Sequence, residues 1–568
     1  MWKGACLVPF GLLRACGDKL KRLFNTEEFS PDVALSKWRI LFLCFALAYA
    51  FILLFNLIKA PIQWDEISHL NGGALIYWGH YDDVVSRAFY PPLFDVFTAM
   101  SFKVFGISLF AARLFPVIFS VLSLWAVFEL ANRMYGGKAG LLSAVMLGIM
   151  PGFFWLSGYA MIETTLMFFI TISLFCFYHW LISHRDRMLV LSGVALGLGF
   201  LAKYQIIIAG VIMILSLILL ARKQLKFAFK KFSIVIASAV LVVTPWLLIA
   251  YEVYRDVLLS KWFYALQVGN PERSMYSTRF PGPIFYFIEL VWPYENIHPI
   301  SLFLYILGLS GLAFMVWRHR HEDKFILIWF ACIFVFFTLI SNREWRYVTP
   351  LFPALAISTA VAVLALGGTL QKAWRKPNSA KKKRLAKTAG VVMAVMVSGA
   401  MLYSIYDAYS YTSQMHITID IKGATDYVYP HMEPDKSIML LCPFNFFSAD
   451  MIEFYLLAKG ERNIDIYQYP DLPVDTYTPT FDIDEFISQC NQYNVQYVFT
   501  YELGGIVPYY NTTLNLQQIY AQLYASGNFT HITDEQTFGT NPRRIFILNF
   551  TGSCLPGAVS LFLTDGGK

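Results

Sequence analysis

Charged residues are scarce in this sequence. Of its 568 residues, 57% are hydrophobic, 17% are aromatic and only 15% are charged, whereas a soluble globular protein has roughly 25% charged residues. The Lys and Arg residues behind the formal net charge of +7 stand in short clusters between apolar segments. This pattern is typical of membrane topology signals and does not indicate a nucleic-acid-binding surface. The composition therefore predicts a polytopic membrane protein with one soluble appendage.

Several catalytic signatures are also missing from the sequence. It contains no glycine-rich phosphate loop, no metal-ligand spacing and no hydrolase nucleophile elbow. Cys44, Cys176 and Cys332 lie within apolar runs, where a packing role is expected. Three further cysteines allow one disulfide but leave its pairing open: Cys442, Cys490 and Cys554. We expect no cleavable signal peptide, because no clear small-residue cleavage site follows the apolar residues 4–13.

Long apolar runs dominate the first 408 residues, and about eleven of them are long enough to be transmembrane helices. The predicted spans are residues 38–58, 111–131, 138–157, 163–182, 188–202, 204–221, 232–253, 298–317, 324–341, 347–367 and 389–407. Most basic clusters fall on one side of the alternating spans, and that side is expected to be cytoplasmic. Residues 59–110 and 254–297 then form long external loops.

The sequence divides into three parts. Residues 1–37 form a cytoplasmic or interfacial N-terminus, residues 38–408 the membrane domain, and residues 409–568 a soluble region outside the cytoplasm. In this last region, predicted strands at 437–442, 495–501 and 545–550 alternate with predicted helices at 483–490 and 514–524, which favours a small α/β domain. Its three glycosylation sequons agree with an external position: Asn511, Asn528 and Asn549.

Trp64-Asp65-Glu66 follows the first predicted span. Adjacent carboxylates at the rim of a bilayer are costly to place and therefore indicate a functional site. Residues 66–78 and 93–105 mix polar and apolar side chains, as helices lying in the membrane interface do. An acidic pair beside the lipid head groups predicts an enzyme that acts on a membrane-borne substrate. The alternative is that these carboxylates are merely solvated.

Three other polar groups fall on the same predicted membrane face. Glu163 begins the fourth span, Lys203 lies between the fifth and sixth, and residues 342–347 lie between the ninth and tenth. Arg and Lys neutralise phosphate oxygens, and a nearby carboxylate can take a proton from an acceptor. Transfer of a sugar from a lipid phosphate needs this combination, whereas hydrolysis of an ordinary glycosidic bond usually needs a second carboxyl group as acid.

Each of these groups also has a structural interpretation. Glu163 is suited to cap its own helix, and Lys203 is suited to reach the lipid head groups. Arg343 and Arg346 are placed to pair with Glu344 or to anchor a helix end. Three histidines are expected to be structural rather than metal ligands: His69, His80 and His298. No metal site or required cofactor is predicted, although the external acidic residues leave a divalent ion open.

Six motifs, in order over roughly residues 38–370, together resemble the polyprenyl-phosphate-dependent glycosyltransferases of the GT-C fold. The resemblance is to the branch of protein O-mannosyltransferases and aminoarabinose lipid A transferases. The motifs are Asp65-Glu66, Tyr90-Pro91-Pro92-Leu93, Arg113-Leu114-Phe115-Pro116, Tyr159 to Leu166 with Glu163, Gly197 to Tyr204, and Glu344-Trp345-Arg346-Tyr347 with Pro350 and Pro353. The sequence departs from the family at Tyr90, where Lys or His is common. It also lacks MIR repeats and a Trp-Trp-Asp-Tyr-Gly motif, which weakens the case for a protein acceptor without excluding it.

The resemblance implies an integral membrane enzyme of the cell membrane or endoplasmic reticulum. Such an enzyme transfers a sugar, with inversion, from dolichyl or undecaprenyl phosphate to a lipid, glycan or protein acceptor outside the cytoplasm. The resemblance makes Asp65 the candidate general base, with Glu66 and Glu163 as further catalytic candidates. The candidate substrate-binding residues are Lys203, Arg343, Arg346, Tyr347, Tyr90 and His69.

Two other classes of function stay open. One is a transporter or flippase of lipid-linked sugars, although the spans are largely free of charge and no internal repeat is evident. The other is an inactive scaffold that presents the C-terminal region to partners. The joint presence of the acidic and basic candidates argues against a scaffold, which has no need of them.

Overall fold

The computed structural model describes residues 36–87, 91–255, 275–293, 297–375, 380–414, 419–441, 447–469, 481–503, 516–531, 538–540 and 543–552. The chain divides into two compact units, each assembled from segments that are distant in sequence. The helical unit comprises residues 1–56, 85–94 and 114–412, and the mixed unit comprises residues 57–84, 95–113 and 413–568. The expected N-terminal interfacial segment falls almost entirely outside the described residues.

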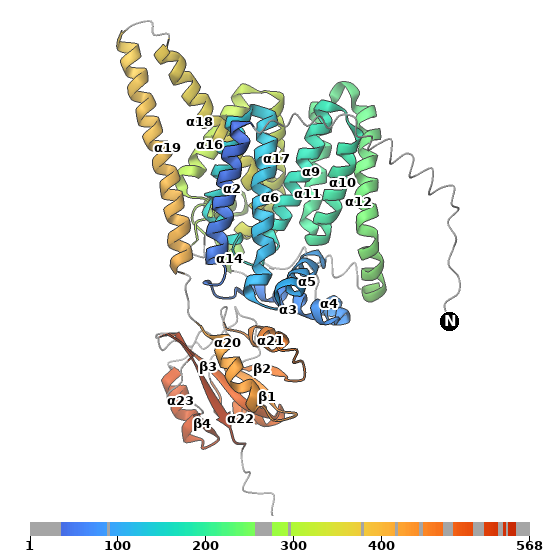
Figure 1. Cartoon of the computed structure of the whole chain (residues 1–568), viewed down its shortest axis with the longest axis vertical. Helices are drawn as coiled ribbons and strands as arrows, with labels where there is room; N and C mark the ends of the chain where they lie inside the picture. Colours follow the sequence, from blue (N-terminus) through green and yellow to red (C-terminus); the bar gives the residue numbers. More distant parts are fainter. Residues whose placement is uncertain are drawn as a thin grey trace, which may run out of the picture. The chain divides into compact units, whose positions relative to one another are not determined.

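The regular secondary structure described for the helical unit consists of helices (Figure 1). Its elements are α2 Lys37–Asn56, α6 Leu109–Tyr135, α7 Gly137–Gly148, α8 Pro151–Leu156, α9 Glu163–Ser183, α10 Asp186–Ala202, η1 Tyr204–Ile206, α11 Ile207–Leu220, η2 Arg222–Gln224, α12 Leu225–Tyr254, α14 Met275–Thr278, α15 Gly282–Glu289, α16 Leu302–Arg318, α17 His321–Leu339, η4 Trp345–Leu351, α18 Phe352–Arg375 and α19 Ala380–Gln414. Each of the eleven predicted spans overlaps one or more of these helices.

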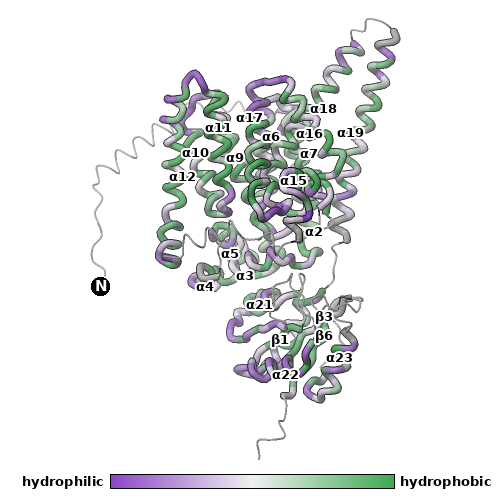
Figure 2. Tube along the Cα trace, turned by 180° about the vertical axis from the view of Figure 1, so that it is seen from behind, coloured by the Kyte–Doolittle hydropathy of each residue, from purple (hydrophilic) through white to green (hydrophobic). Residues whose placement is uncertain are grey.

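Six helical segments within the described ranges are by themselves long and apolar enough to cross a membrane. They are Lys37–Asn56, Leu109–Tyr135, Glu163–Ser183, Arg222–Val253, Trp345–Arg375 and Lys383–Ser410. Shorter apolar helices cover Gly137–Gly148, Tyr204–Leu220 and Leu302–Arg318. Figure 2 shows hydrophobic residues running along the helices of this unit. Leu241 and Leu339 are 77% and 79% exposed, and such an apolar exterior is stable against lipid rather than water.

One predicted span is interrupted for a physical reason. Residues 138–157 form two helices, α7 and α8, instead of one. Met150 has an extended backbone and Pro151 is the first residue of α8. Proline lacks the N–H that would continue the hydrogen bonding of α7, but it is well suited to the first turn of a new helix. The apolar pattern alone does not reveal this break.

Small residues allow close helix packing in the helical unit. A Cβ atom at Gly311 of α16 would overlap the carbonyl group of Ser358 in α18. A Cβ atom at Gly193 of α10 would similarly overlap the carbonyl oxygen of Val235 in α12. Because lipid supplies little hydrophobic drive between membrane helices, such close backbone approach is a main source of their association.

The C-terminal part of the mixed unit contains a six-stranded sheet. The strands are β1 Ser437–Leu441, β2 Ile466–Tyr469, β3 Val495–Leu503, β4 Phe529–His531, β5 Phe538–Thr540 and β6 Arg543–Phe550. Their order is β2-β1-β3-β6-β4, with β5 also paired to β6. β1 runs parallel to β2 and β3, whereas β6 is antiparallel to its neighbours. β1 is buried along its whole length, as its continuous apolar sequence requires of a central strand.

The helices of this region are α20 Ile421–Val428, η5 Tyr429–His431, α21 Ala449–Leu457, α22 Ile483–Gln492 and α23 Leu516–Ala525. Met439 and Leu441 share a core with Phe486 of α22 and Leu523 of α23. The three strands and two helices predicted here coincide with β1, β3, β6, α22 and α23 to within two residues at most ends. Cys490 is buried in this core as a free thiol, whereas Cys442 and Cys554 lie outside the described residues.

The mixed unit also contains most of the first predicted external loop. This loop forms α3 Trp64–Trp78, α4 Tyr81–Arg87 and α5 Leu93–Phe105, and two of these match the predicted interfacial helices. The second predicted loop is described only in part, as α14 and α15. Residues 57–84 and 95–113 group with residues 413–568, so the acidic motif and the C-terminal region belong to one compact body.

The glycine contact between α16 and α18 leads to a stability prediction. In Gly311→Ala the new methyl group must push the two helices apart, and we expect a loss of about 1–3 kcal/mol in unfolding free energy. Gly210→Ala is the matched control, because a Cβ atom at Gly210 of α11 meets nothing within 4 Å. The control should be neutral or slightly stabilising, since alanine favours a helix over glycine. Thermal unfolding of the detergent-solubilised protein measures the stability of both variants. Equal stability of Gly311→Ala and Gly210→Ala would contradict the close packing of α16 on α18.

Candidate functional site

The acidic motif forms the first turn of α3. Gln63 precedes the helix, and the Glu66 carboxylate accepts a hydrogen bond of 3.1 Å from the Gln63 backbone N–H. In return the Gln63 side chain accepts a hydrogen bond from the Glu66 backbone N–H, and the two contacts form a capping box. Carboxylates are favoured at this position because the exposed N–H groups and the helix dipole attract negative charge. The local sequence therefore fixes where the helix begins and where its two acids stand.

Glu66 is buried and paired with Arg113. Nε and Nη2 of Arg113 donate to the two carboxylate oxygens of Glu66 at 2.7 Å each, and both side chains are fully buried. Nη1 and Nη2 also donate to backbone carbonyls at 2.6, 3.0 and 2.9 Å, those of Leu57, Ala60 and Pro61. A buried guanidinium is stable only when it is paired and hydrogen-bonded in this way.

Asp65, in contrast, is exposed. It stands one residue before Glu66 on the same helical turn, and successive side chains of a helix point about 100° apart. The two adjacent carboxylates therefore have opposite environments. Glu66 has both oxygens engaged by Arg113, whereas Asp65 is the acid of the pair that a solvent-borne or lipid-borne group can reach.

A second buried pair joins α3 to α5. Nδ1 of His69 lies 2.7 Å from Oδ1 of Asp95, and both side chains are buried. The two helices approach closely here, because a Cβ atom at Gly72 would lie 2.8 Å from the Asp95 carboxyl carbon. His69, a predicted substrate-binding residue, is thus held by a carboxylate of the same unit.

Helix α21 of the C-terminal region packs on α3. The Asn71 side-chain amide donates to the Asp450 carbonyl oxygen at 3.0 Å and to the Glu453 carboxylate at 3.1 Å. The Trp78 indole N–H donates to the Leu457 carbonyl oxygen at 2.8 Å. These bonds tie the middle and the C-terminal end of α3 to one helix that lies about 380 residues later in the chain.

Tyr455 of α21 brings a further polar group close to the buried ion pair. Burial raises the pKa of its hydroxyl, and Arg113 and Glu66 are near enough to act on that pKa in opposite directions. Past the end of α21, Arg462 bonds to His80 at 3.0 Å and pairs with Asp83. These partners could not be predicted from the sequence, since no motif links residues 449–462 to residues 64–83.

A separate group of charges lies in the helical unit. Glu163 is the first residue of α9, and Lys203 occupies the extended break between α10 and η1. Nζ of Lys203 donates to Oε1 of Glu163 at 3.1 Å, and the two side chains are 7% and 6% exposed. Oε2 of Glu163 is buried and accepts no hydrogen bond from the described residues. The predicted turn at Lys203 therefore exists, and it points a buried cation at a buried acid.

The segment η4 adds to this group. Nζ of Lys203 lies 5.5 Å from the centre of the Tyr347 ring, within the range of a cation–π contact. Arg346 forms an ion pair with Glu344 and also acts electrostatically on Glu163. The structure thus gathers four of the predicted residues within this unit: Glu163, Lys203, Arg346 and Tyr347.

Other predicted residues lie elsewhere or outside the described ranges. Arg343 donates to the backbone carbonyls of Ser277 and Thr338 at 3.3 Å each, which is an anchoring arrangement. Tyr90 and Asn511 lie outside the described residues. Asn528 is half-buried in the turn before β4, and Asn549 is half-buried within β6. Within the described ranges, no three His, Cys, Asp or Glu side chains are grouped as a metal site requires.

The Arg113–Glu66 pair leads to a stability prediction. Arg113→Met leaves the buried Glu66 carboxylate without its partner, and we expect the free energy of unfolding to fall by about 3–5 kcal/mol. Adding Glu66→Gln removes the uncompensated charge and should recover part of this loss. Arg39→Met is the control, because Arg39 pairs with Glu129 in the same bidentate manner but is 32% exposed, where such pairs contribute about 0–1 kcal/mol. The free energies of unfolding of the two single variants and the double variant are measured by chemical denaturation. If the losses of Arg113→Met and Glu66→Gln simply add in the double variant, the two side chains are not coupled.

Comparison with known proteins finds similarity over part of the chain. A family model described as dolichyl-phosphate-mannose-protein mannosyltransferase matches residues 90–249. An uncharacterized protein of Aquifex aeolicus is 27% identical over 274 residues, covering 48% of this chain and 52% of that protein. The undecaprenyl phosphate-alpha-4-amino-4-deoxy-L-arabinose arabinosyl transferase of Edwardsiella ictaluri is 26% identical over 282 residues, covering 48% and 49%. The chain spans about half the length of the curated relatives it matches.

Solved structures extend the likeness over most of the chain. The crystal structure of ArnT from Cupriavidus metallidurans in the apo state aligns with a TM-score of 0.57 at 15% identity, covering 91% of this chain and 99% of that one. The apo oligosaccharyltransferase of Archaeoglobus fulgidus aligns with a TM-score of 0.51 at 14% identity, covering 82% and 70%. Likenesses at these identities concern the fold. The family model and the sequence relatives, which match part of the chain, agree with the resemblance to GT-C fold glycosyltransferases that its motifs carry.

Proposed function

We propose that the protein is an inverting glycosyltransferase that moves one sugar from a polyprenyl-phosphate donor to an acceptor outside the cytoplasm. Relatives named as undecaprenyl-phosphate aminoarabinose transferases support this donor class, as does the ArnT structure bound to undecaprenyl phosphate, with a TM-score of 0.54. The observation that carries the proposal is the division of roles within one acidic pair. Glu66 is locked by Arg113, and Asp65 is exposed beside it.

Asp65 acts as the general base. It takes the proton of the acceptor hydroxyl or amine, whose oxygen or nitrogen then attacks the anomeric carbon of the sugar. The bond from that carbon to the phosphate oxygen breaks, and polyprenyl phosphate leaves with the electron pair. Glu66 cannot take this proton without giving up its bonds to Arg113, so its role is to position the turn that carries Asp65.

Lys203 and Arg346 bind the donor phosphate and neutralise the charge that develops on the leaving group. In the structure each cation is already paired, Lys203 with Glu163 and Arg346 with Glu344. The phosphate therefore competes with these carboxylates for the two cations. Glu163 keeps Lys203 oriented, and its second oxygen is suited to accept a hydrogen bond from a sugar hydroxyl.

The topology of this proposal follows from the sequence. About eleven membrane spans, counting the short and broken helices, place the basic loops in the cytoplasm and the acidic motif outside it. Residues 409–568 then form an α/β domain on the external side, which carries the three sequons at Asn511, Asn528 and Asn549. The acceptor is a lipid, a glycan or a protein, and the reaction needs no cofactor.

The base assignment predicts a specific loss of turnover. Asp65→Asn keeps the shape of the side chain but removes its basicity, and we expect the turnover rate to fall about 10²–10⁴-fold. Binding of the donor should be unchanged. The measurement is transfer or release of sugar from a panel of radiolabelled polyprenyl-phosphate sugars by purified protein.

Asp82→Asn provides the matched control for this change. Tyr81-Asp82-Asp83 opens α4 as Trp64-Asp65-Glu66 opens α3, and Asp82 is also exposed. This control should keep full activity. Equal turnover by Asp65→Asn and wild type would remove Asp65 as the base. If the wild type turns over no donor but moves lipid-linked sugar between vesicle leaflets, the protein is a flippase instead.

The phosphate assignment predicts a loss of donor affinity. Arg346→Met removes one charge-assisted contact, worth about 1.5–3 kcal/mol, and should raise the dissociation constant of the donor roughly 10- to 100-fold. Lys372→Met, an exposed change near the far end of α18, should have no effect. Equilibrium binding of a labelled polyprenyl-phosphate sugar in detergent measures both. Unchanged affinity in Arg346→Met would show that this arginine serves only to hold Glu344.

A further inference from the structure

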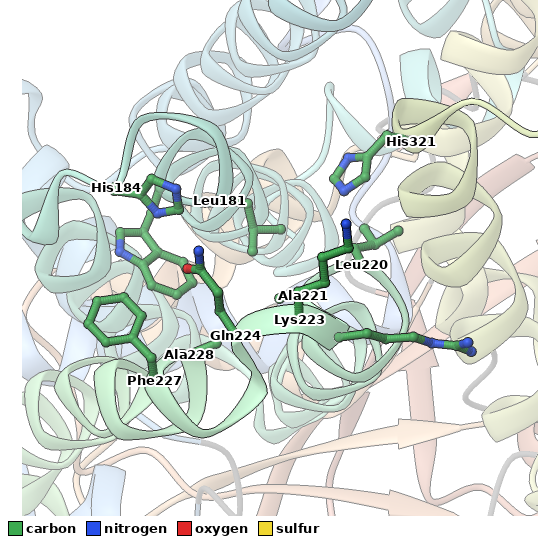
Figure 3. A pocket seen from close by; sticks show the side chains of 11 residues that line it. Leu181, His184, Leu220, Ala221, Lys223, Gln224, Phe227, Ala228 and His321 are labelled. Carbon is green, nitrogen blue, oxygen red and sulfur yellow. The ribbon is translucent and has the colours of Figure 1, made fainter.

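A cavity with several polar side chains in its lining lies within the helical unit (Figure 3). Its volume is about 380 Å³, and it lies where α9 ends, α11 meets η2 and α12, and α17 begins. Glu163 stands at the opposite end of α9, and a helix of 21 residues is roughly 30 Å long. The cavity is therefore not part of the site proposed above.

The lining of this cavity is basic and aromatic. It comprises Trp180, Leu181, His184, Leu220, Ala221, Arg222, Lys223, Gln224, Phe227, Ala228 and His321. Among these described residues, four are basic or can become so, and none is acidic. Such a lining favours an anion, because no carboxylate competes for the cationic groups.

Helix ends and a short turn determine where the polar residues of the lining lie. His184 ends α9 in the left-handed conformation, with φ of 54°. The short turn η2 presents Arg222 and Lys223 between two apolar helices, and His321 is the first residue of α17. Figure 3 shows His184 and Gln224 on one side of the cavity and Lys223 and His321 on the other. The polar groups thus surround a space that an anion of moderate size can fill.

Apolar side chains continue from the polar rim. Phe227 is 49% exposed on the outside of α12, and Trp180 and Leu181 come from the last turn of α9. Lys226 and Lys230 follow on α12 but do not line the cavity. Basic pockets between membrane helices, with apolar surface beside them, are typical of sites for anionic lipid head groups.

We propose that this cavity binds the phosphate head group of an anionic membrane lipid, in the leaflet that faces the basic loops. Arg222 and Lys223 contact the phosphate oxygens, with His184, His321 and Gln224 as further hydrogen-bonding partners. The acyl chains lie against the apolar surface next to Phe227. A free phosphate ester has the same charged group but lacks those chains, so it would gain only the polar part of the site.

Binding of defined lipids to the purified full-length protein tests the proposal. The probes are dioleoyl-phosphatidylglycerol, dioleoyl-phosphatidylcholine and soluble glycerol phosphate, and native mass spectrometry in detergent counts the bound molecules. Phosphatidylglycerol should bind at least about 10-fold more tightly than phosphatidylcholine. Equal binding of the two lipids would overturn recognition by charge. Glycerol phosphate that displaces the lipid at similar concentration would overturn the lipid as the occupant.

Two double variants locate the binding. Arg222→Gln with Lys223→Gln removes the charges that line the cavity, and we expect affinity for phosphatidylglycerol to fall about 10-fold or more. Lys226→Gln with Lys230→Gln removes equal charge from the same basic segment, outside the cavity, and should change affinity less than about 3-fold. Equal losses in the two variants would show diffuse attraction rather than a site. If the first variant is unfolded by size-exclusion chromatography, His321→Ala replaces it, with a smaller loss expected.

Discussion

The conformation of the acidic segment depends on one buried guanidinium. Arg113 bonds to both oxygens of Glu66 and to three carbonyls of the link between α2 and α3. A charge removed from water tolerates almost no loss of partners. Residues 57–66 therefore cannot rearrange separately, because any movement would leave either the arginine or the carbonyls unsatisfied. The acidic turn is held by a residue 47 positions further along the chain, at the start of a long apolar helix.

This constraint gives two adjacent acids different environments. A helix points neighbouring side chains in different directions, so Glu66 is buried against Arg113 while Asp65 is exposed. The cations of the helical unit are also held by carboxylates, Lys203 by Glu163 and Arg346 by Glu344. In both places an ion pair balances the charge of groups that stand among largely apolar residues.

Much of this arrangement could be predicted from local patterns. Apolar run lengths predict where the helices lie. Residue type and predicted topology single out Asp65-Glu66, Glu163, Lys203 and Arg346 as site candidates, which stay predictions. Long-range pairing could not be predicted. Arg113 stands in one of the motifs that carry the family resemblance, but nothing in its neighbours indicates a bond to Glu66. The contact of α21 with α3 could not be predicted for the same reason, since Asn71 and Glu453 are about 380 residues apart in the sequence. The helix break at Pro151 was also missed, because the residues around it are continuously apolar.

The bonds between α3 and α21 have a consequence for biosynthesis. A ribosome makes α3 first, and several hundred residues must follow before Asp450, Glu453 and Leu457 exist. During that interval the amide of Asn71 and the indole of Trp78 lack their final acceptors. The acidic helix therefore completes its folding only after most of the chain has been inserted into the membrane. The order of synthesis thus delays the final packing of α3 until the C-terminal region has emerged.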